Sequence, residues 1–323
     1  MKKDLKTTMA NKAHEEIPGN PSVSTSSKQK LNDRSNGKPL RILSEEDWKF
    51  WMHNGYVVIK NAIPKAQAKA TADFIWEFDE KEANDPSTWY AQPRAEMKMK
   101  ELAGTGMVEA YNHQTLWNNR QTQKIYDAFV DVWGTEKLWV TIDRVNLNFP
   151  QRPGEEKEGF IHWDYDPETR PQNVQGVIAL ADQMDEKMGG FQCIPWLYRN
   201  YDSWKLTQPE DKDRFQPNLA ALHDKIVKVV MEAGDLLIFN STEPHGIRPN
   251  RSENKVRIAQ YISMMPAEEE NQELIDWRVN SWKNRITPEG YAFPGDPRNW
   301  EQERYTRADL STLGKKLLGL NKW

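Results

Sequence analysis

Three residues of this chain have the types and the spacing of a metal site. His162 and Asp164 are two positions apart, and His245 follows 81 residues after Asp164. Side chains two positions apart on a β-strand project from the same face, so this imidazole and carboxylate would lie together. Two imidazoles and one carboxylate form the facial triad of non-heme Fe(II) oxygenases, which leaves coordination positions open. The pattern therefore predicts His162, Asp164 and His245 as catalytic Fe(II) ligands.

An arginine follows the second histidine at a distance that suits a cosubstrate. Arg257 lies 12 residues after His245, in a segment (255–262) whose apolar and β-branched residues predict a strand. A guanidinium can hold one end of a dicarboxylate through two parallel hydrogen bonds. Arg248 and Arg251 fall in the preceding turn, where a charge is more often solvated. We therefore expect Arg257 to bind the cosubstrate, and Arg248 is a candidate for a substrate carboxylate or phosphate.

Strand-like segments surround these residues. Short apolar or alternating runs, bounded by Gly, Pro or Asn, occupy 56–63, 138–149, 174–181, 226–230, 233–239 and 255–262. They continue without a linker-like break, which predicts one mainly β domain over residues 41–323 with a C-terminal extension from about 266. Flanking helices are predicted from the Ser44–Asp47 capping box to residue 54, and over 64–83, 121–133 and 310–320.

The segment 138–149 has an unusual polar row. Arg144, Asn146 and Asn148 share one side of the predicted strand, and Val145 and Leu147 take the other. A polar row facing solvent is the ordinary explanation. The alternative is that these residues line a polar pocket inside the domain, which makes Asn146 a candidate cosubstrate residue. The sequence leaves both interpretations open.

Four motifs, in order, resemble the phytanoyl-CoA dioxygenase family over about residues 44–265. They are His162-x-Asp164, the run Gly189–Pro195, the run Gly234–Phe239, and His245 to Ser252 followed by Arg257. The resemblance implies a double-stranded β-helix core of the jelly-roll or cupin-like type. It also implies Fe(II), 2-oxoglutarate and dioxygen as cofactor and cosubstrates, and oxidation of a small molecule with release of succinate and CO2. A carboxylate at Asp164 argues against halogenation and favours hydroxylation, with desaturation or cyclisation as the alternatives.

Two departures from the family pattern concern the substrate. The run Pro195–Tyr198 differs from the usual residues after the double glycine, and Ile247 replaces a small hydroxyl residue. The first departure argues against the acyl-CoA substrate for which the family is named. Trp163, Trp196 and Tyr198 are candidates for a substrate wall, although large aromatics are more often packed in a core.

Composition excludes several other classes. The net charge of −4 and the pI of about 6.0 show no basic footprint for nucleic acid. A single cysteine, Cys193, cannot form an intrachain disulfide and fits a reducing compartment, so a cytoplasmic location is expected. No apolar run is long enough to cross a bilayer, so no membrane partner is expected. Residues 1–40 are polar without periodicity, which predicts disorder. The oligomeric state is not readable from the sequence.

Three other kinds of protein could also carry such a set of residues. A hydrolytic metalloenzyme would need a general base near the metal and would have no use for Arg257. A cupin-like enzyme without a cosubstrate usually draws further histidines from the first motif, and His162 has no such neighbour. A non-catalytic, metal-binding β-sandwich would make the triad accidental. Dioxygen-dependent succinate formation discriminates among them, because function belongs to the site and not to the fold.

Overall fold

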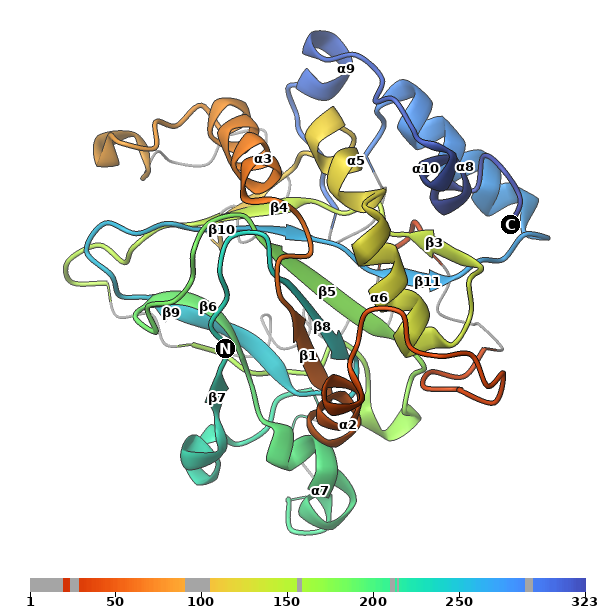
Figure 1. The fold of residues 1–323 in the computed structure, drawn as a ribbon. Helices are drawn as coiled ribbons and strands as arrows, with labels where there is room; N and C mark the ends of the chain where they lie inside the picture. The colour runs from red at the N-terminus through yellow and green to blue at the C-terminus, as the bar shows by residue number, and fades with distance from the viewer. Residues whose placement is uncertain are drawn as a thin grey trace.

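Two antiparallel β-sheets pack face to face and form the core of the molecule. The computed structural model describes residues 20–23, 29–90, 105–155, 159–209, 213, 215–287 and 293–323. Helices lie on the outer side of the larger sheet (Figure 1). The protein is mainly β with flanking helices and has the double-stranded β-helix core that was predicted.

The larger sheet has six strands in the order β1-β8-β5-β10-β4-β2, and each neighbouring pair is antiparallel. Strands that are distant in the sequence thus become neighbours, which brings the C-terminal part of the domain against the N-terminal part. The strands are β1 (Tyr56–Ile59), β2 (Met107–Val108), β4 (Val145–Asn148), β5 (Val174–Ala179), β8 (Leu236–Asn240) and β10 (Arg257–Tyr261).

The smaller sheet has the order β7-β6-β9 and carries the second predicted histidine at the start of its edge strand. Its strands are β6 (Met188–Cys193), β7 (Val227–Lys228) and β9 (His245–Asn250). An isolated antiparallel bridge joins His162 to His245. The segment that contains His162 and Asp164 therefore lies beside β9 and is joined to the smaller sheet by this single bridge.

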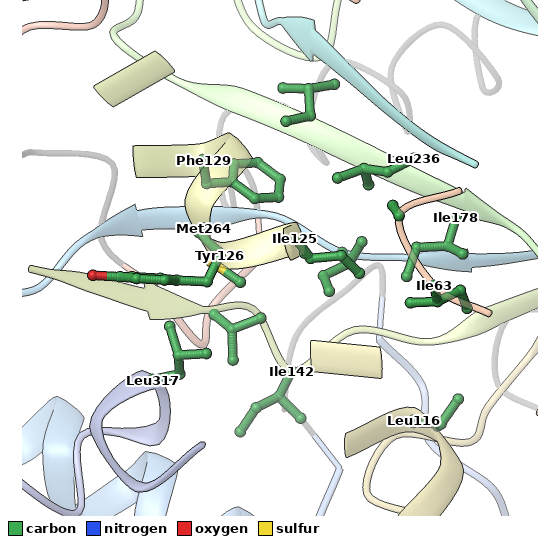
Figure 2. Packing of buried hydrophobic residues seen from close by; sticks show 14 of the residues in the cluster. Ile63, Leu116, Ile125, Tyr126, Phe129, Ile142, Ile178, Leu236, Met264 and Leu317 are labelled. Carbon is green, nitrogen blue, oxygen red and sulfur yellow. The ribbon is translucent and has the colours of Figure 1, made fainter. Parts of the chain in front are cut away.

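Alternation along the strands gives the larger sheet two different faces. On the inner face, Val177, Ala179 and Ala259 pack with Phe191 of the smaller sheet in one buried cluster. On the outer face, Ile178, Leu236 and Ile258 belong to a second cluster that the helices cover. Figure 2 shows Ile125 and Phe129 of the covering helix facing Ile178 and Leu236. The inner face is thus left for the site.

The helices largely follow the signals in the sequence. Helix α2 (Glu45–Asn54) has the predicted capping box between Ser44 and Asp47, and Gly55 ends it with φ 72°. The prediction for 64–83 ends too late, because α3 stops at Phe78. The remaining helices of the core are α3 (Lys65–Phe78), α5 (Gln114–Arg120), α6 (Gln123–Trp133) and α7 (Pro195–Lys205), with 3-10 turns at 86–88, 167–169, 219–221 and 223–225.

One predicted strand is in fact two. The segment 138–149 divides into β3 (Leu138–Val140), which pairs with β11 (Met264–Pro266), and β4 in the larger sheet. The break coincides with an exchange of hydrogen bonds, in which the Thr141 amide donates to the Ser263 carbonyl at 2.8 Å and the Ser263 amide donates to the Thr141 hydroxyl at 2.9 Å. A hydroxyl that competes for backbone partners interrupts the ladder.

The polar row of β4 faces inward. Asn148 lies opposite Arg257 and Asn146 lies opposite Ala259, whose side chain belongs to the inner cluster. Arg144 and Asn146 are almost completely buried. Arg144 and Asn146 therefore do not face solvent, and the lining of a polar pocket by this row stays a prediction.

The prediction that residues 1–40 are disordered is wrong for the part that the structure describes. Residues 20–23 and 29–40 pack against the helices, and Leu31 is buried. The contacts are mostly hydrogen bonds: the Asn32 amide donates to the Val132 carbonyl at 2.9 Å, and the Trp51 indole donates to Asn32 Oδ1 at 2.7 Å. Hydrophobic periodicity cannot reveal such contacts. Residues 1–19 and 24–28 lie outside the described residues.

The C-terminal extension folds back onto the core. It contains α8 (Gln272–Asn284), α9 (Trp300–Arg304) and α10 (Thr312–Leu318), the last within the predicted 310–320 helix. Figure 1 shows α10 beside β3, against which it packs, and α8 next to α10. The buried Arg278 guanidinium donates to the carbonyls of Val140, Leu317 and Leu318, so one side chain joins the extension to β3. Among the helices described, none combines the length and the apolar character needed to cross a membrane.

Candidate metal centre

The two motifs of the predicted triad meet through backbone pairing. The His162 amide donates to the His245 carbonyl at 2.9 Å, and the His245 amide donates to the His162 carbonyl at 3.0 Å. Residues directly opposite in such a pair point to the same face. Asp164, two positions after His162, returns to that face. Local extended backbone therefore brings together side chains that are 81 residues apart.

The three side chains converge on one point. Asp164 Oδ1 lies 3.0 Å from His162 Nε2, and Asp164 Oδ2 lies 3.2 Å from His245 Nε2. One nitrogen or oxygen from each residue lies within 4.8 Å of the others. Two imidazole nitrogens and a carboxylate oxygen in this arrangement match the donor set of a facial triad.

The charge of Asp164 is fixed by its neighbours. Loss of solvation raises the pKa of the carboxyl, but the imidazoles of His162 and His245 lower it by more, so the pKa stands well below 3.8. The carboxylate is thus ionised throughout the neutral range. An anionic oxygen beside two imidazoles is the form that a divalent cation binds.

The orientation of His245 is set on two sides. Its Nδ1 lies 3.0 Å from the Glu243 carbonyl, to which it donates, so Nε2 is the nitrogen that faces the triad. Phe239 packs on the ring at 4.4 Å between centroids, and Phe191 stacks at 5.8 Å. These contacts hold the imidazole in one rotamer.

Glycines allow the strands of this centre to approach closely. A Cβ atom on Gly246 would lie 1.7 Å from the Phe160 carbonyl oxygen, so only glycine permits the pairing of His162 with His245. Gly190 has φ 110°, and a Cβ there would lie 2.8 Å from Arg248 Nη2. The double glycine of the family motif therefore makes room for a guanidinium.

Arg257 has the features expected of an anion-binding residue. Its side chain is completely buried on the inner face, and Nη1 donates to Asn146 Oδ1 at 2.8 Å. Among the residues that the structure describes, the buried Nε and Nη2 groups have no hydrogen-bond partner. Unsatisfied buried donors of a cation are costly unless a ligand completes them. The structure brings Asn146 to Arg257, the two residues that the sequence proposed for the cosubstrate.

Arg248 is placed differently from the prediction of a substrate contact. Its Nη1 donates to the carbonyls of Phe191 and Val229, and its Nη2 donates to the Gly189 carbonyl. The side chain is buried, and burial together with the nearby Arg257 charge lowers its pKa to about 10. These bonds tie β6 to its neighbours. The contacts of Arg248 are therefore those of a residue that stabilises the packing of these strands.

The three aromatic candidates for a substrate wall do not gather around the triad. Trp163 turns to the face opposite His162, where it is buried against Tyr201 and its indole donates to the Thr242 carbonyl at 3.0 Å. Trp196 packs partly buried against the same cluster. Tyr198 of α7 lies next to Gly55, the residue that ends α2. Packing explains the positions of Trp163 and Trp196.

Two residues near the centre were missed by the sequence reasoning. Gln175 in β5 donates to Asp164 Oδ2 at 2.5 Å. Phe160 is 48% exposed, and its ring centroid lies 5.1 Å from that of His162. A signal existed for both, because alternation places Phe160 on the face of His162, and Gln175 is a polar residue on the inner face of an apolar strand.

Comparisons with known proteins agree with the geometry. Residues 51–259 match the family model "Phytanoyl-CoA dioxygenase (PhyH)". "Ava biosynthesis cluster protein O" of Aspergillus versicolor is 24% identical over 68% of this chain and 77% of its own length. A Dictyostelium discoideum protein named "Putative phytanoyl-CoA dioxygenase" is 24% identical over 85% of this chain and 86% of its own length.

A solved structure extends the likeness to nearly the whole chain. The GlcNAc-inducible protein GIG2 of Candida albicans superposes with a TM-score of 0.63 over 98% of this chain and 84% of its own, at 14% identity. Identity at that level shows a shared fold and nothing of its chemistry. The C-terminal extension, beyond the residues that the family model matches, therefore belongs to a fold seen elsewhere.

Proposed function

The chain belongs to the phytanoyl-CoA dioxygenase family and is a 2-oxoglutarate-dependent non-heme iron oxygenase, and from this premise we propose that it hydroxylates an unactivated C–H bond of a small molecule. Succinate and carbon dioxide are the co-products. The observation that carries the proposal is the triad together with Arg257, a buried arginine on the inner face of the larger sheet, whose Nε and Nη2 groups have no hydrogen-bond partner among the described residues.

His162, Asp164 and His245 are the proposed Fe(II) ligands. The residues fit the metal, because the donor set is two imidazoles and one ionised carboxylate, with the ligand atoms facing one another. When bound, Fe(II) and 2-oxoglutarate supply the activation of dioxygen and the oxidising power of the reaction. The protein supplies the geometry: the Glu243 carbonyl fixes the tautomer of His245, and the backbone bridge fixes His162 beside it.

Arg257 and Asn146 are the proposed residues for the distal carboxylate of 2-oxoglutarate. The Nε and Nη2 groups offer two donors from one planar group, which suits two oxygens of a carboxylate. Asn146 occupies the third edge of the guanidinium and orients it. A carboxylate here would satisfy the buried donors and neutralise the charge, so the cosubstrate removes a cost that the fold otherwise carries.

The inner face is suited to exclude water from the reaction. Val177, Ala179 and Ala259 of the larger sheet meet Phe191 and Phe239 in a buried apolar cluster that reaches the His245 ring. A dry, low-dielectric surround strengthens the electrostatic contacts of the site and limits side reactions. Because this cluster is apolar, few side chains of the inner face can form polar contacts with a bound substrate.

The product class follows from Asp164 and the substrate class from the relatives. A carboxylate at this position leaves no ligand vacancy of the kind a halide needs, so oxygen transfer is the proposed outcome. The Aspergillus versicolor relative is named for a biosynthesis cluster, which supports a secondary metabolite as the substrate. The engaged hydrogen bonds of Arg248 do not favour a phosphorylated or acyl-CoA substrate at that residue.

The test is dioxygen-dependent succinate formation from 2-oxoglutarate with Fe(II), measured against a panel of small molecules with and without a chelator. Asp164→Ala and His245→Ala should abolish it. Asp166→Ala and His223→Ala are matched controls that should retain it, since Asp166 caps a 3-10 turn and His223 is exposed on another. Wild-type succinate production by either ligand variant would overturn the ligand assignment.

Labelled dioxygen then identifies the reaction. Hydroxylation adds one labelled oxygen to the substrate, whereas desaturation or ring closure removes two hydrogens and adds no label. We expect the first result in a chloride buffer, by mass spectrometry of the product. A chlorinated product would contradict the argument from Asp164.

A further inference from the structure

We propose that Gln175 is a positioning residue for Asp164, which holds the carboxylate in place when the metal is bound. The inference rests on the proposed function, because it takes Asp164 to be a ligand. It concerns the support of that ligand and not the reaction itself, so it can fail while the oxygenase assignment stands.

The geometry of Gln175 is specific. Its Nε2 donates to Asp164 Oδ2 at 2.5 Å, across 11 positions of the chain. The residue sits on β5 opposite Phe239 of β8, and therefore on the inner face of the sheet. The next two residues of β5 on this face, Val177 and Ala179, are apolar and belong to the buried cluster. A polar amide at the start of this row is thus aimed at the metal ligand.

Metal binding would change the contacts of the Asp164 carboxylate with the two imidazoles but not the contact with Gln175. In the structure, Oδ1 lies 3.0 Å from His162 Nε2 and Oδ2 lies 3.2 Å from His245 Nε2. A nitrogen that coordinates a metal uses its lone pair and carries no proton to donate. The Gln175 amide is not a ligand and keeps its N–H. It is therefore a donor that the carboxylate retains in both states.

The strand pair that carries Gln175 also supports a second proposed ligand, His245. The partner of Gln175 across the sheet, Phe239, packs on the His245 ring at 4.4 Å between centroids. One strand pair thus supports the ring of one ligand through Phe239 and the carboxylate of another through Gln175. Hydrogen bonds to ligating carboxylates orient them, and losing such a partner typically lowers metal affinity or activity about 10- to 100-fold.

The experiment measures metal affinity without catalysis. Co(II) is titrated into the metal-free full chain, without 2-oxoglutarate, and the visible spectrum of the bound ion is recorded. Gln175→Met keeps the length of the side chain and removes the donor. We expect Co(II) affinity to fall by about 10- to 100-fold, with a changed spectrum, since the carboxylate is free to rotate. The control is Gln260→Met, which breaks a buried hydrogen bond to the Leu116 carbonyl on the outer face of β10.

The outcomes separate the possibilities. Gln260→Met should lower the thermal midpoint yet keep wild-type Co(II) affinity and spectrum, because it is a purely structural lesion. If Gln175→Met binds Co(II) within about twofold of the wild type, or if Gln260→Met weakens binding as much, the positioning role is refuted. If the wild-type chain itself binds no Co(II), it is the proposed ligand set that fails.

Discussion

The sharpest quantitative prediction concerns Arg257→Lys. The side chain is completely buried, Nη1 is engaged by Asn146, and Nε and Nη2 are the two donors that remain. A lysine keeps the charge but loses the planar fork, so a carboxylate held by two parallel bonds keeps about one. A hydrogen bond to a charged group contributes about 1.5–3 kcal/mol. At about 1.4 kcal/mol per tenfold, the dissociation constant of 2-oxoglutarate should rise roughly 10- to 100-fold.

The assay is a calorimetric titration of 2-oxoglutarate into the chain loaded with Ni(II), which reports binding without turnover. A second readout is the stabilisation by ligand, which depends on the ratio of ligand concentration to dissociation constant. At a fixed, saturating concentration, a tenfold weaker complex loses about 1.4 kcal/mol of this stabilisation. The two measurements must agree if the loss is in binding.

Arg248→Lys is the matched control. Its guanidinium serves the carbonyls of Phe191, Val229 and Gly189, so the lysine variant should lower the free energy of unfolding and leave 2-oxoglutarate affinity within about twofold. If Arg248→Lys weakens 2-oxoglutarate binding and Arg257→Lys does not, the choice of arginine is wrong. Equal losses in both would mean that the two residues share the carboxylate.

Two stability predictions test the packing around the core. Burial against Phe74 lowers the pKa of His113 from 6.5 to about 4. As the pH falls, the unfolded chain therefore binds a proton at this residue before the folded chain does. The free energy of unfolding should decrease by up to roughly 3 kcal/mol between about pH 6.5 and pH 4. His113→Asn should flatten this slope in urea titrations across that range, and an unchanged slope would assign it elsewhere. Asp131→Asn should lower the free energy of unfolding by about 2–4 kcal/mol in the same titration. The buried carboxylate accepts hydrogen bonds from the backbone amides of residues 41–43, and an asparagine turns one acceptor into a donor. A loss below about 1 kcal/mol would mean that other contacts hold residues 41–43.

The juxtaposition of the three side chains in the candidate site could be predicted, because strand alternation and pairing decide it. His162 and Asp164 share a face by their spacing alone, and the distant His245 needed only an antiparallel bridge to join them. The same rule should have excluded Trp163 from the substrate wall, since the residue between two inward-facing residues points outward. Arg257 could be preferred to Arg248 by its strand position, but only the structure shows that its Nε and Nη2 have no partner among the described residues.

What the sequence could not supply were contacts made by single polar groups. The N-terminal segment packs through hydrogen bonds from Arg34 to the Asp131 carbonyl and from the Asn32 amide to the Val132 carbonyl, and such bonds leave no periodic pattern. The break between β3 and β4 depends on Ser263, which is more than a hundred residues away. Arg278 anchors the C-terminal extension by carbonyls of three residues, and a lone arginine in a polar helix carries no sign of burial.

The register of β10 connects the packing of the fold to its chemistry. Arg257 and Ala259 face the interior, while Ile258 and Gln260 face the helices. A slip of one residue would move the guanidinium into the apolar outer layer and the isoleucine into the site. Two outer contacts oppose that slip: Ile258 is buried in the helix-covered cluster, and Gln260 Oε1 accepts from the Asn119 amide at 2.7 Å. Together with the pairing of β10 to β4 and β5, these outer contacts hold the register in which Arg257 meets Asn146. The packing of the outer face and the polar contact on the inner face therefore depend on the same register.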